Sequence, residues 1–154
     1  MRKCFRRNEG LSLLEVLLAA AILVVALLGI MSLFPTALQN VRYGGHMSQA
    51  SSLAQEMVEL MRTQPFATVS SYNGLDTRSG PPAGLPASVL NHFTQWANNI
   101  APQNPSGALP QGWGTIAVAL VPGLPDLLQL TVTVGWQERG NPTVNLVTYV
   151  AQYE

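Results

Sequence analysis

The sequence predicts an α+β protein in which a long N-terminal helix is followed by a small antiparallel β-sheet. One observation is an uncharged apolar run from Val16 to Phe34, which has the length of a membrane-spanning helix. The other is the alternation of apolar and polar residues from Leu128 to Gln137, which is typical of a half-buried strand. We therefore expect a transmembrane and then amphipathic helix packed on the sheet.

The apolar run contains 19 residues and is interrupted only by Gly29 and Ser32. A helix rises about 1.5 Å per residue, so this run can cross a hydrocarbon layer of about 30 Å. Glu15 stands directly before it. A carboxylate costs on the order of 2.5–3.5 kcal/mol at the centre of a membrane helix and less near the interface. Glu15 therefore needs a specific explanation.

Charge is distributed unevenly along the chain. Charged residues make up only 10% of the sequence and apolar residues 47%. Half of the basic residues precede Gly10, namely Arg2, Lys3, Arg6 and Arg7. The positive-inside rule therefore predicts a cytoplasmic N-terminus and an exported remainder. The exported part has no basic patch, so we expect no nucleic acid partner.

Residues 1–10 form a short basic leader. The segment from Ser32 to Ala37 makes a poor small-x-small secretory cleavage site, whereas cleavage at Gly10 would preserve the apolar run as a permanent helix. The single cysteine, Cys4, lies in the leader. The mature chain would then have neither a disulfide nor a thiolate metal site.

Residues 7–34 resemble the class III signal of type IV pilins and type II secretion pseudopilins. The resemblance rests on the basic leader, on Gly10 as its last residue, on Leu11 as the new N-terminus and on Glu15 as the fifth mature residue. Two positions depart from the family pattern. Phenylalanine is usual in place of Leu11, and Pro35 stands about one helical turn later than the proline that many members carry.

The resemblance implies that a prepilin peptidase cleaves between Gly10 and Leu11 and methylates the Leu11 amine. It also implies that Glu15 of an incoming subunit pairs with the Leu11 amine of a neighbour during filament assembly. The partners would be the prepilin peptidase, other pilins or pseudopilins, and the bacterial inner membrane. In the alternative interpretation, Glu15 lies near its own helix N-terminus, where the helix dipole favours an anion.

The helix is expected to continue as an amphipathic segment to about Thr63. Pro35 should bend it, and Gly44 and Gly45 should weaken it by roughly 1 kcal/mol each relative to alanine. After the glycines, one stripe recurs with the period of a helix. It consists of Ala50, Leu53, Ala54, Met57, Leu60 and Met61. Glu59 and Arg62 are spaced for an ion pair, and Pro65 should close the helix.

Residues 66–112 are rich in glycine, proline, serine and asparagine and are predicted to be mainly surface loop. Within them, residues 88–100 have helical apolar spacing and would carry Phe93 and Trp96 against the domain. The two histidines, His46 and His92, have no second ligand at metal-binding spacing. We expect both to be ordinary surface or half-buried residues.

Three strands are predicted in the last third of the chain. They cover residues 115–121, 128–137 and 143–152, and a turn at residues 139–142 joins the last two. Such a meander would pack on the amphipathic half of the helix, with Trp136 in the core or on the sheet face. This part also resembles the C-terminal sheet of minor pilins and I-type pseudopilins.

These patterns divide the chain into four parts. They are a leader (1–10), a transmembrane or filament-core helix (11–35), an amphipathic helix half (36–64) and a loop-rich globular β domain (65–154). No catalytic, nucleotide-binding or metal-binding motif occurs, so we expect neither an enzyme nor a cofactor.

The leading hypothesis is a minor pilin or pseudopilin. It would wait in the inner membrane and then enter a type IV pilus or a type II secretion pseudopilus. The alternative is a single-pass membrane-anchored periplasmic binding module outside any filament, whose segment 66–112 would recognise a soluble partner. An exported hydrolase is a third and more distant hypothesis.

Overall fold

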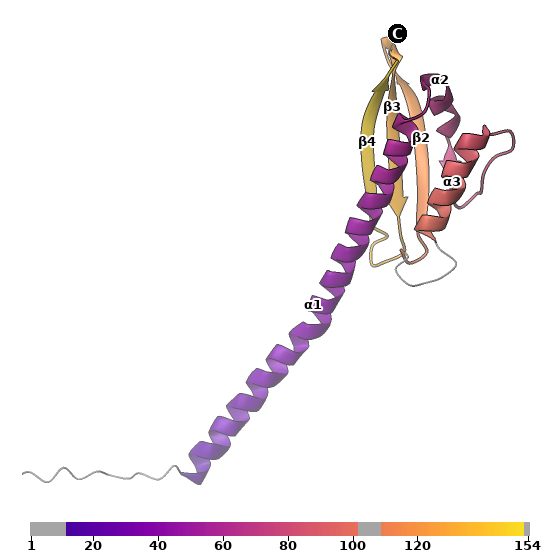
Figure 1. Ribbon diagram of the computed structural model, residues 1–154. Helices are drawn as coiled ribbons and strands as arrows, with labels where there is room; N and C mark the ends of the chain where they lie inside the picture. Colours follow the sequence, from indigo (N-terminus) through magenta and orange to yellow (C-terminus); the bar gives the residue numbers. More distant parts are fainter. Residues whose placement is uncertain (1–11, 102–108, 153–154) are drawn as a thin grey trace, which may run out of the picture. The chain divides into compact units, whose positions relative to one another are not determined.

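A computed structural model describes residues 12–101 and 109–152 of the chain, and it has the α+β architecture that the sequence predicts (Figure 1). One long helix precedes two short helical segments, a third helix and an antiparallel sheet. The elements are α1 (Leu13–Arg62), α2 (Phe66–Val69), the 3-10 turn η1 (Ser70–Tyr72), β1 (Leu75–Asp76), α3 (Ala87–Ile100), β2 (Trp113–Val121), β3 (Leu124–Gly135) and β4 (Thr143–Ala151).

The chain divides into two compact units, Met1–Tyr43 and Gly44–Glu154. The division falls at the glycine pair that the sequence identifies as a weak point of the helix. Helix α1 is nevertheless assigned without interruption through both Pro35 and the glycines. Proline removes only one backbone donor from a helix, so it does not end this one.

The sheet belongs to the second unit and has the strand order β1-β2-β3-β4, with every neighbouring pair antiparallel. Val132 in the middle of β3 lies between Ile116 of β2 and Leu146 of β4. The three predicted strands are thus confirmed as a meander. Strand β1 was not predicted; it has two residues and pairs Leu75 with Ile116.

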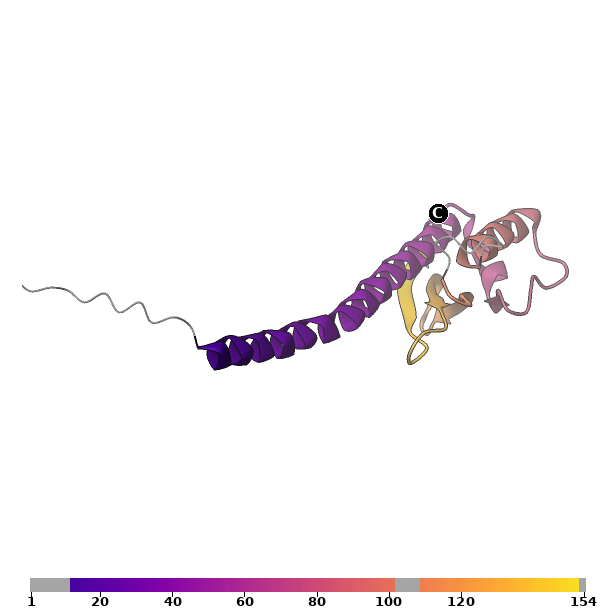
Figure 2. The same cartoon turned by 90° about the horizontal axis from the view of Figure 1, so that it is seen from below.

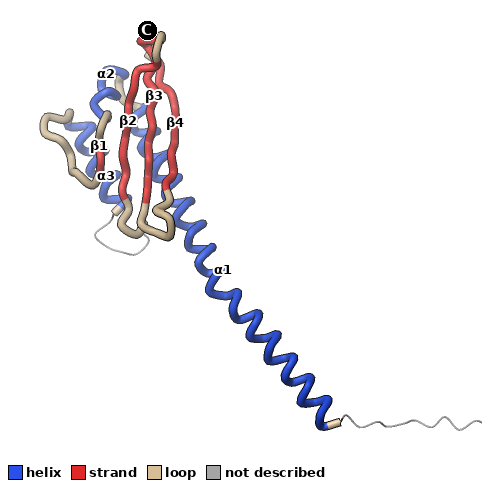
Figure 3. The backbone as a smooth tube through the Cα atoms, turned by 180° about the vertical axis from the view of Figure 1, so that it is seen from behind, coloured by secondary structure: helices blue, strands red, loops and turns tan. Residues whose placement is uncertain are grey.

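In the second unit, the last turns of α1 and the whole of α3 lie on the same face of the sheet (Figure 3). The view turned by 90° places both helices on one side of the strands (Figure 2). Alternate residues of β3 are buried against them, as predicted; they are Leu128, Leu130, Val132 and Val134.

The predicted stripe of α1 is largely confirmed. Its buried members are Ala50, Leu53, Ala54, Met57 and Met61. Leu60 is only partly buried, and Val58 is buried in addition. The stripe is therefore wider than the sequence indicated, because α1 meets both the sheet and α3 and so buries more than one row of side chains.

Trp96 joins α3 to both neighbouring layers. Its side chain is fully buried, and its Nε1 donates a hydrogen bond of 2.9 Å to the carbonyl oxygen of Leu53 in α1. Its ring lies over Gly114 of β2, where an added Cβ would come within 2.3 Å of the ring. A glycine at this position therefore allows α3 to approach the sheet.

The prediction that residues 66–112 are mainly loop is wrong for residues 66–76. Helix α2, turn η1 and strand β1 all lie there, and Val69, Tyr72 and Leu75 are fully buried. Each of these elements has four residues or fewer, which is too short for a helical or strand period to appear in the sequence. The helix expected over 88–100 is confirmed as α3, with Phe93 and Trp96 in the core.

Candidate functional site

The most unusual surface of the molecule is the helix of the first unit. Every residue from Ser12 to Tyr43 is exposed, including large apolar side chains such as Leu13, which is 78% exposed. An 18-residue window of α1 has a mean hydropathy of 2.9, and none of it is buried. By length and composition this helix could cross a membrane. An apolar surface of this extent marks a contact with lipid or with other proteins.

Glu15 lies in the first turn of α1. It is the only charged residue from Ser12 to Val41, so a single carboxylate stands at one end of a continuous apolar surface. Its backbone N–H donates to the carbonyl oxygen of Ser12 at 2.9 Å. Gly10 and Leu11 lie outside the described residues, so the predicted cleavage and methylation sites stay predictions.

The polar side chain in the middle of the apolar run is satisfied within the helix. The Ser32 hydroxyl donates to the Gly29 carbonyl oxygen at 2.7 Å, a bond that serine commonly makes inside helices. Next to it, Ile30, Leu33, Phe34 and Ala37 line a shallow, wholly apolar hollow of about 190 Å³. Apart from Glu15, this part of the helix surface therefore offers apolar contacts.

The second unit contains a polar cluster that joins α1 to the turn between β3 and β4. One carboxylate oxygen of Glu138 accepts a 2.7 Å bond from Trp136 Nε1 and lies 3.2 Å from His46 Nδ1. The bond from Trp136, followed by the contact with His46, holds the pKa of Glu138 below its ordinary value. Trp136 is fully buried, in agreement with the prediction that it belongs to the core.

A second histidine contact connects α3 to η1. The Tyr72 hydroxyl lies 2.6 Å from His92 Nδ1, and the two rings are stacked with 6.3 Å between their centroids. Burial raises the pKa of Tyr72 from 10.0 to about 12. Both histidines therefore have structural partners within the second unit.

The raised pKa of Tyr72 makes the folded state sensitive to alkali. The unfolded chain releases this proton near pH 10 and the folded chain near pH 12, so folded stability should fall as pH rises through this window. We expect Tyr72→Phe to flatten this part of the stability profile, measured by chemical unfolding at a series of pH values. Tyr149→Phe, at an exposed tyrosine, is the control. An equal alkaline loss of stability in Tyr72→Phe would contradict the assignment.

The end of β1 carries a surface cluster that sequence reasoning did not anticipate. The guanidinium of Arg78 binds Asp76, with 2.7 Å between Nη2 and Oδ2, and lies 4.4 Å from the centre of the Trp113 ring. The bond from Arg78 lowers the pKa of Asp76. This cluster fastens the short strand β1 to β2.

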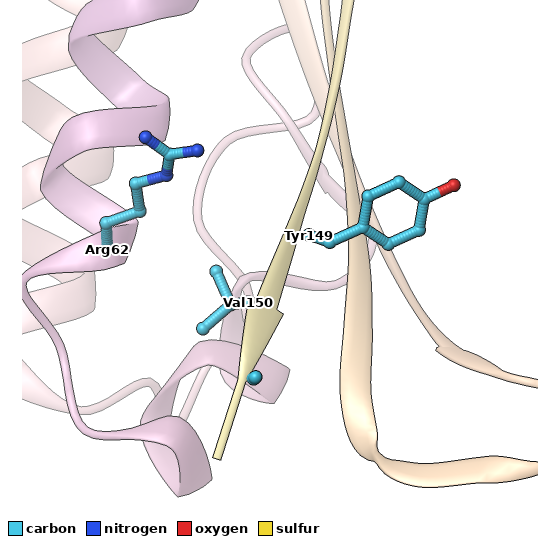
Figure 4. A pocket seen from close by; sticks show the side chains of 4 residues that line it. Arg62, Tyr149 and Val150 are labelled. Carbon is cyan, nitrogen blue, oxygen red and sulfur yellow. The ribbon is translucent and has the colours of Figure 1, made fainter. Parts of the chain in front are cut away.

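Two further hollows occur on the second unit, and neither gathers a catalytic set. One, of about 300 Å³, is lined by Arg62, Tyr149, Val150 and Ala151; in it Val150 projects from β4 toward α1 while Tyr149 projects the other way (Figure 4). The other, of about 590 Å³, follows the polar outer side of α3. Within residues 12–101 and 109–152, no group of three or more His, Cys, Asp or Glu side chains is placed to hold a metal ion.

Sequence reasoning selected Glu15 and the apolar helix, and it identified the Glu59–Arg62 pair, which lies at 3.3 Å. It missed the partners of both histidines. His46 and Glu138 are 92 residues apart, and Tyr72 and His92 are 20 apart. No local pattern connects residues at such separations.

Comparison with protein-family models, with curated proteins and with solved structures found no match to this chain.

Proposed function

We propose that this chain is a filament subunit of the type IV pilin-like class, either a minor pilin or a pseudopilin. The observation that carries the proposal is the exposed apolar run of α1 from Val16 to Phe34, with one carboxylate, Glu15, directly before it. Such a run needs apolar surroundings. The carboxylate needs a cation, because an unpaired charge in apolar surroundings is costly.

Two successive environments meet these requirements. Before assembly the helix crosses the inner membrane, with the basic leader in the cytoplasm and the Gly44–Glu154 unit exported. During assembly the helix passes from lipid into a bundle of like helices. This transfer exchanges one apolar environment for another, so packing and polar contacts decide its direction. The ion pair between Glu15 and a neighbour's Leu11 amine is the contact that favours the bundle and fixes its register.

The second unit supports this role because it carries its own core. Its sheet, α3 and the last turns of α1 share one cluster of buried side chains, to which none of the described residues 12–43 contributes. The apolar helix is thus left for membrane and subunit contacts. The second unit then forms the outer part of the filament, as an initiator, tip or modifying subunit.

A single-pass membrane-anchored binding module outside any filament is the competing proposal, since the same helix would serve as its anchor. In such a module, Glu15 would have no role beyond its favourable position in the first helical turn. The two proposals therefore differ in what they expect from this carboxylate and from the leader.

Processing of the leader tests the proposal directly. We expect the chain expressed with a prepilin peptidase to lose residues 1–10 and to begin at Leu11 with one added methyl group. Mass spectrometry of the intact protein and of its N-terminal peptide would measure both changes. Gly10→Val should block cleavage, and Gly29→Ala, in the middle of the apolar run, should leave it unchanged. An intact leader, or a cut next to Ala37, would show that this proposal is wrong.

A further inference from the structure

The cluster of His46, Glu138 and Trp136 joins parts of the second unit that are far apart in the sequence. His46 belongs to α1, whereas Trp136 and Glu138 follow the end of β3. The His46 and Trp136 rings form a T-shaped pair, with 6.4 Å between centroids and 72° between planes. The turn between β3 and β4 thus contacts the first helical turn of this unit.

Glu138 is positioned independently of His46. Its Oε2 accepts the 2.7 Å bond from the buried Trp136 indole, so the carboxylate stays in place whether or not the imidazole is charged. The side chains of His46 and Glu138 are each 25% exposed. The imidazole can therefore exchange protons with water while it faces a fixed anion.

The cluster lies at a part of α1 that has little other stabilisation. It comes directly after Gly44 and Gly45, each of which costs a helix roughly 1 kcal/mol relative to alanine. The first fully buried residue of α1 is Ala50, and before it only Met47 packs partly against the core. The hydrogen bond between His46 and Glu138 therefore holds the turn of α1 that, within this unit, packs least against the core.

We infer that His46, Glu138 and Trp136 form a pH-dependent latch, which fastens the first helical turn after the glycine pair to the β3–β4 turn when the imidazole is protonated. A neutral imidazole can still donate one hydrogen bond to the carboxylate, but an imidazolium adds the attraction between opposite charges. The inference goes beyond the proposed function and does not depend on it.

The direction of the pH effect follows from the two groups. Histidine gains its positive charge as the pH falls, so acid favours the charged form of the latch. Glu138 sets the lower limit. Because its pKa is lowered, its contribution to stability is present above the ordinary carboxyl range and is lost as pH falls through its own pKa. The latch is therefore tightest in weak acid.

The other charged or titratable groups close to the cluster in the sequence are Arg42 and Tyr43, about one turn earlier on α1, and Arg139, next to Glu138. None of them is a carboxylate, and along α1 the next carboxylate after His46 is Glu56, ten residues later. Glu138 is therefore the group that drives the switch.

Amide hydrogen exchange on the full chain in detergent micelles tests the latch. The quantity to measure is the protection of backbone amides 47–54 of α1 at about pH 5.5 and about pH 8, corrected for intrinsic exchange. We expect roughly two- to fivefold more protection at the lower pH, since partly exposed ion pairs have effects of this size. The variants are Glu138→Gln, which keeps an acceptor for Trp136, and His46→Asn. Glu59→Gln is the control, because Glu59 pairs with Arg62 on the same helix.

The latch predicts that both test variants lose the pH-dependent part of the protection and that Glu59→Gln keeps it. The double variant His46→Asn/Glu138→Gln should then be no less protected at about pH 5.5 than either single variant. The inference is overturned if Glu138→Gln retains the full pH response, or if wild-type protection is the same at both pH values. Circular dichroism of each variant would verify that its fold is intact.

Discussion

Glu15→Ala should remove this chain from filaments while leaving it in the membrane. The substitution makes the helix more apolar, so membrane insertion should be unaffected. In the filament that we propose, it would leave the cation at Leu11 without its partner. Loss of one member of a buried ion pair costs about 3–5 kcal/mol, which corresponds to a loss of incorporation of roughly two orders of magnitude or more. The measurement is the ratio of this subunit in sheared filaments to that in the membrane fraction, by quantitative immunoblot.

Two variants make the Glu15 result specific. Glu15→Gln keeps the size of the side chain and removes only its charge, so it should fail as Glu15→Ala does. Ser32→Ala removes the other polar group of the apolar run, whose hydroxyl is already bonded to Gly29, and should assemble normally. If Glu15→Ala entered filaments at the wild-type level, the role proposed for this carboxylate would be wrong. If the wild-type chain itself were absent from sheared filaments, the filament proposal would fail, and a membrane-anchored module outside the filament would be the better explanation.

The parts of the fold that could be predicted from the sequence are those with a repeated local pattern. Helix α1, the alternating strand β3 and the amphipathic helix α3 each extend over ten residues or more, so their periods are visible. The short elements between residues 66 and 76 were not predictable, because their burial depends on contacts with distant parts of the chain. Leu75, for example, is buried through its pairing with Ile116.

The residues of the candidate site also differ in whether the sequence predicts them. Glu15 and the apolar helix could be selected from the sequence, because a carboxylate beside a membrane-length run conflicts with the preference of that run for lipid. The latch at His46 could not be predicted from the sequence. Its carboxylate is 92 residues away, and the features that position it are a turn and a tryptophan at the end of another strand. Only the folded chain brings these groups together.

Trp96→Ala should have the largest effect on the stability of the second unit and little effect on processing of the leader. Trp96 is fully buried between α1, α3 and β2, and truncation of such a residue typically costs about 3–5 kcal/mol. The cavity would open directly over Gly114, which has no side chain to fill it. We expect loss of protection of the β3 amides in hydrogen exchange on the full chain, while cleavage after Gly10 continues.

Two companion variants separate packing from hydrogen bonding at Trp96. Trp96→Phe keeps much of the apolar volume and removes the donor to Leu53, so it should cost less than Trp96→Ala, with about 1 kcal/mol of its effect due to the lost bond. Leu90→Ala, at a partly exposed position on the same helix, should have a small effect. If Trp96→Ala also abolished cleavage, the peptidase would depend on the folded second unit, and the apolar helix could not be the only functional site. If cleavage continued while the sheet lost its protection, recognition by the peptidase would not require the folded sheet.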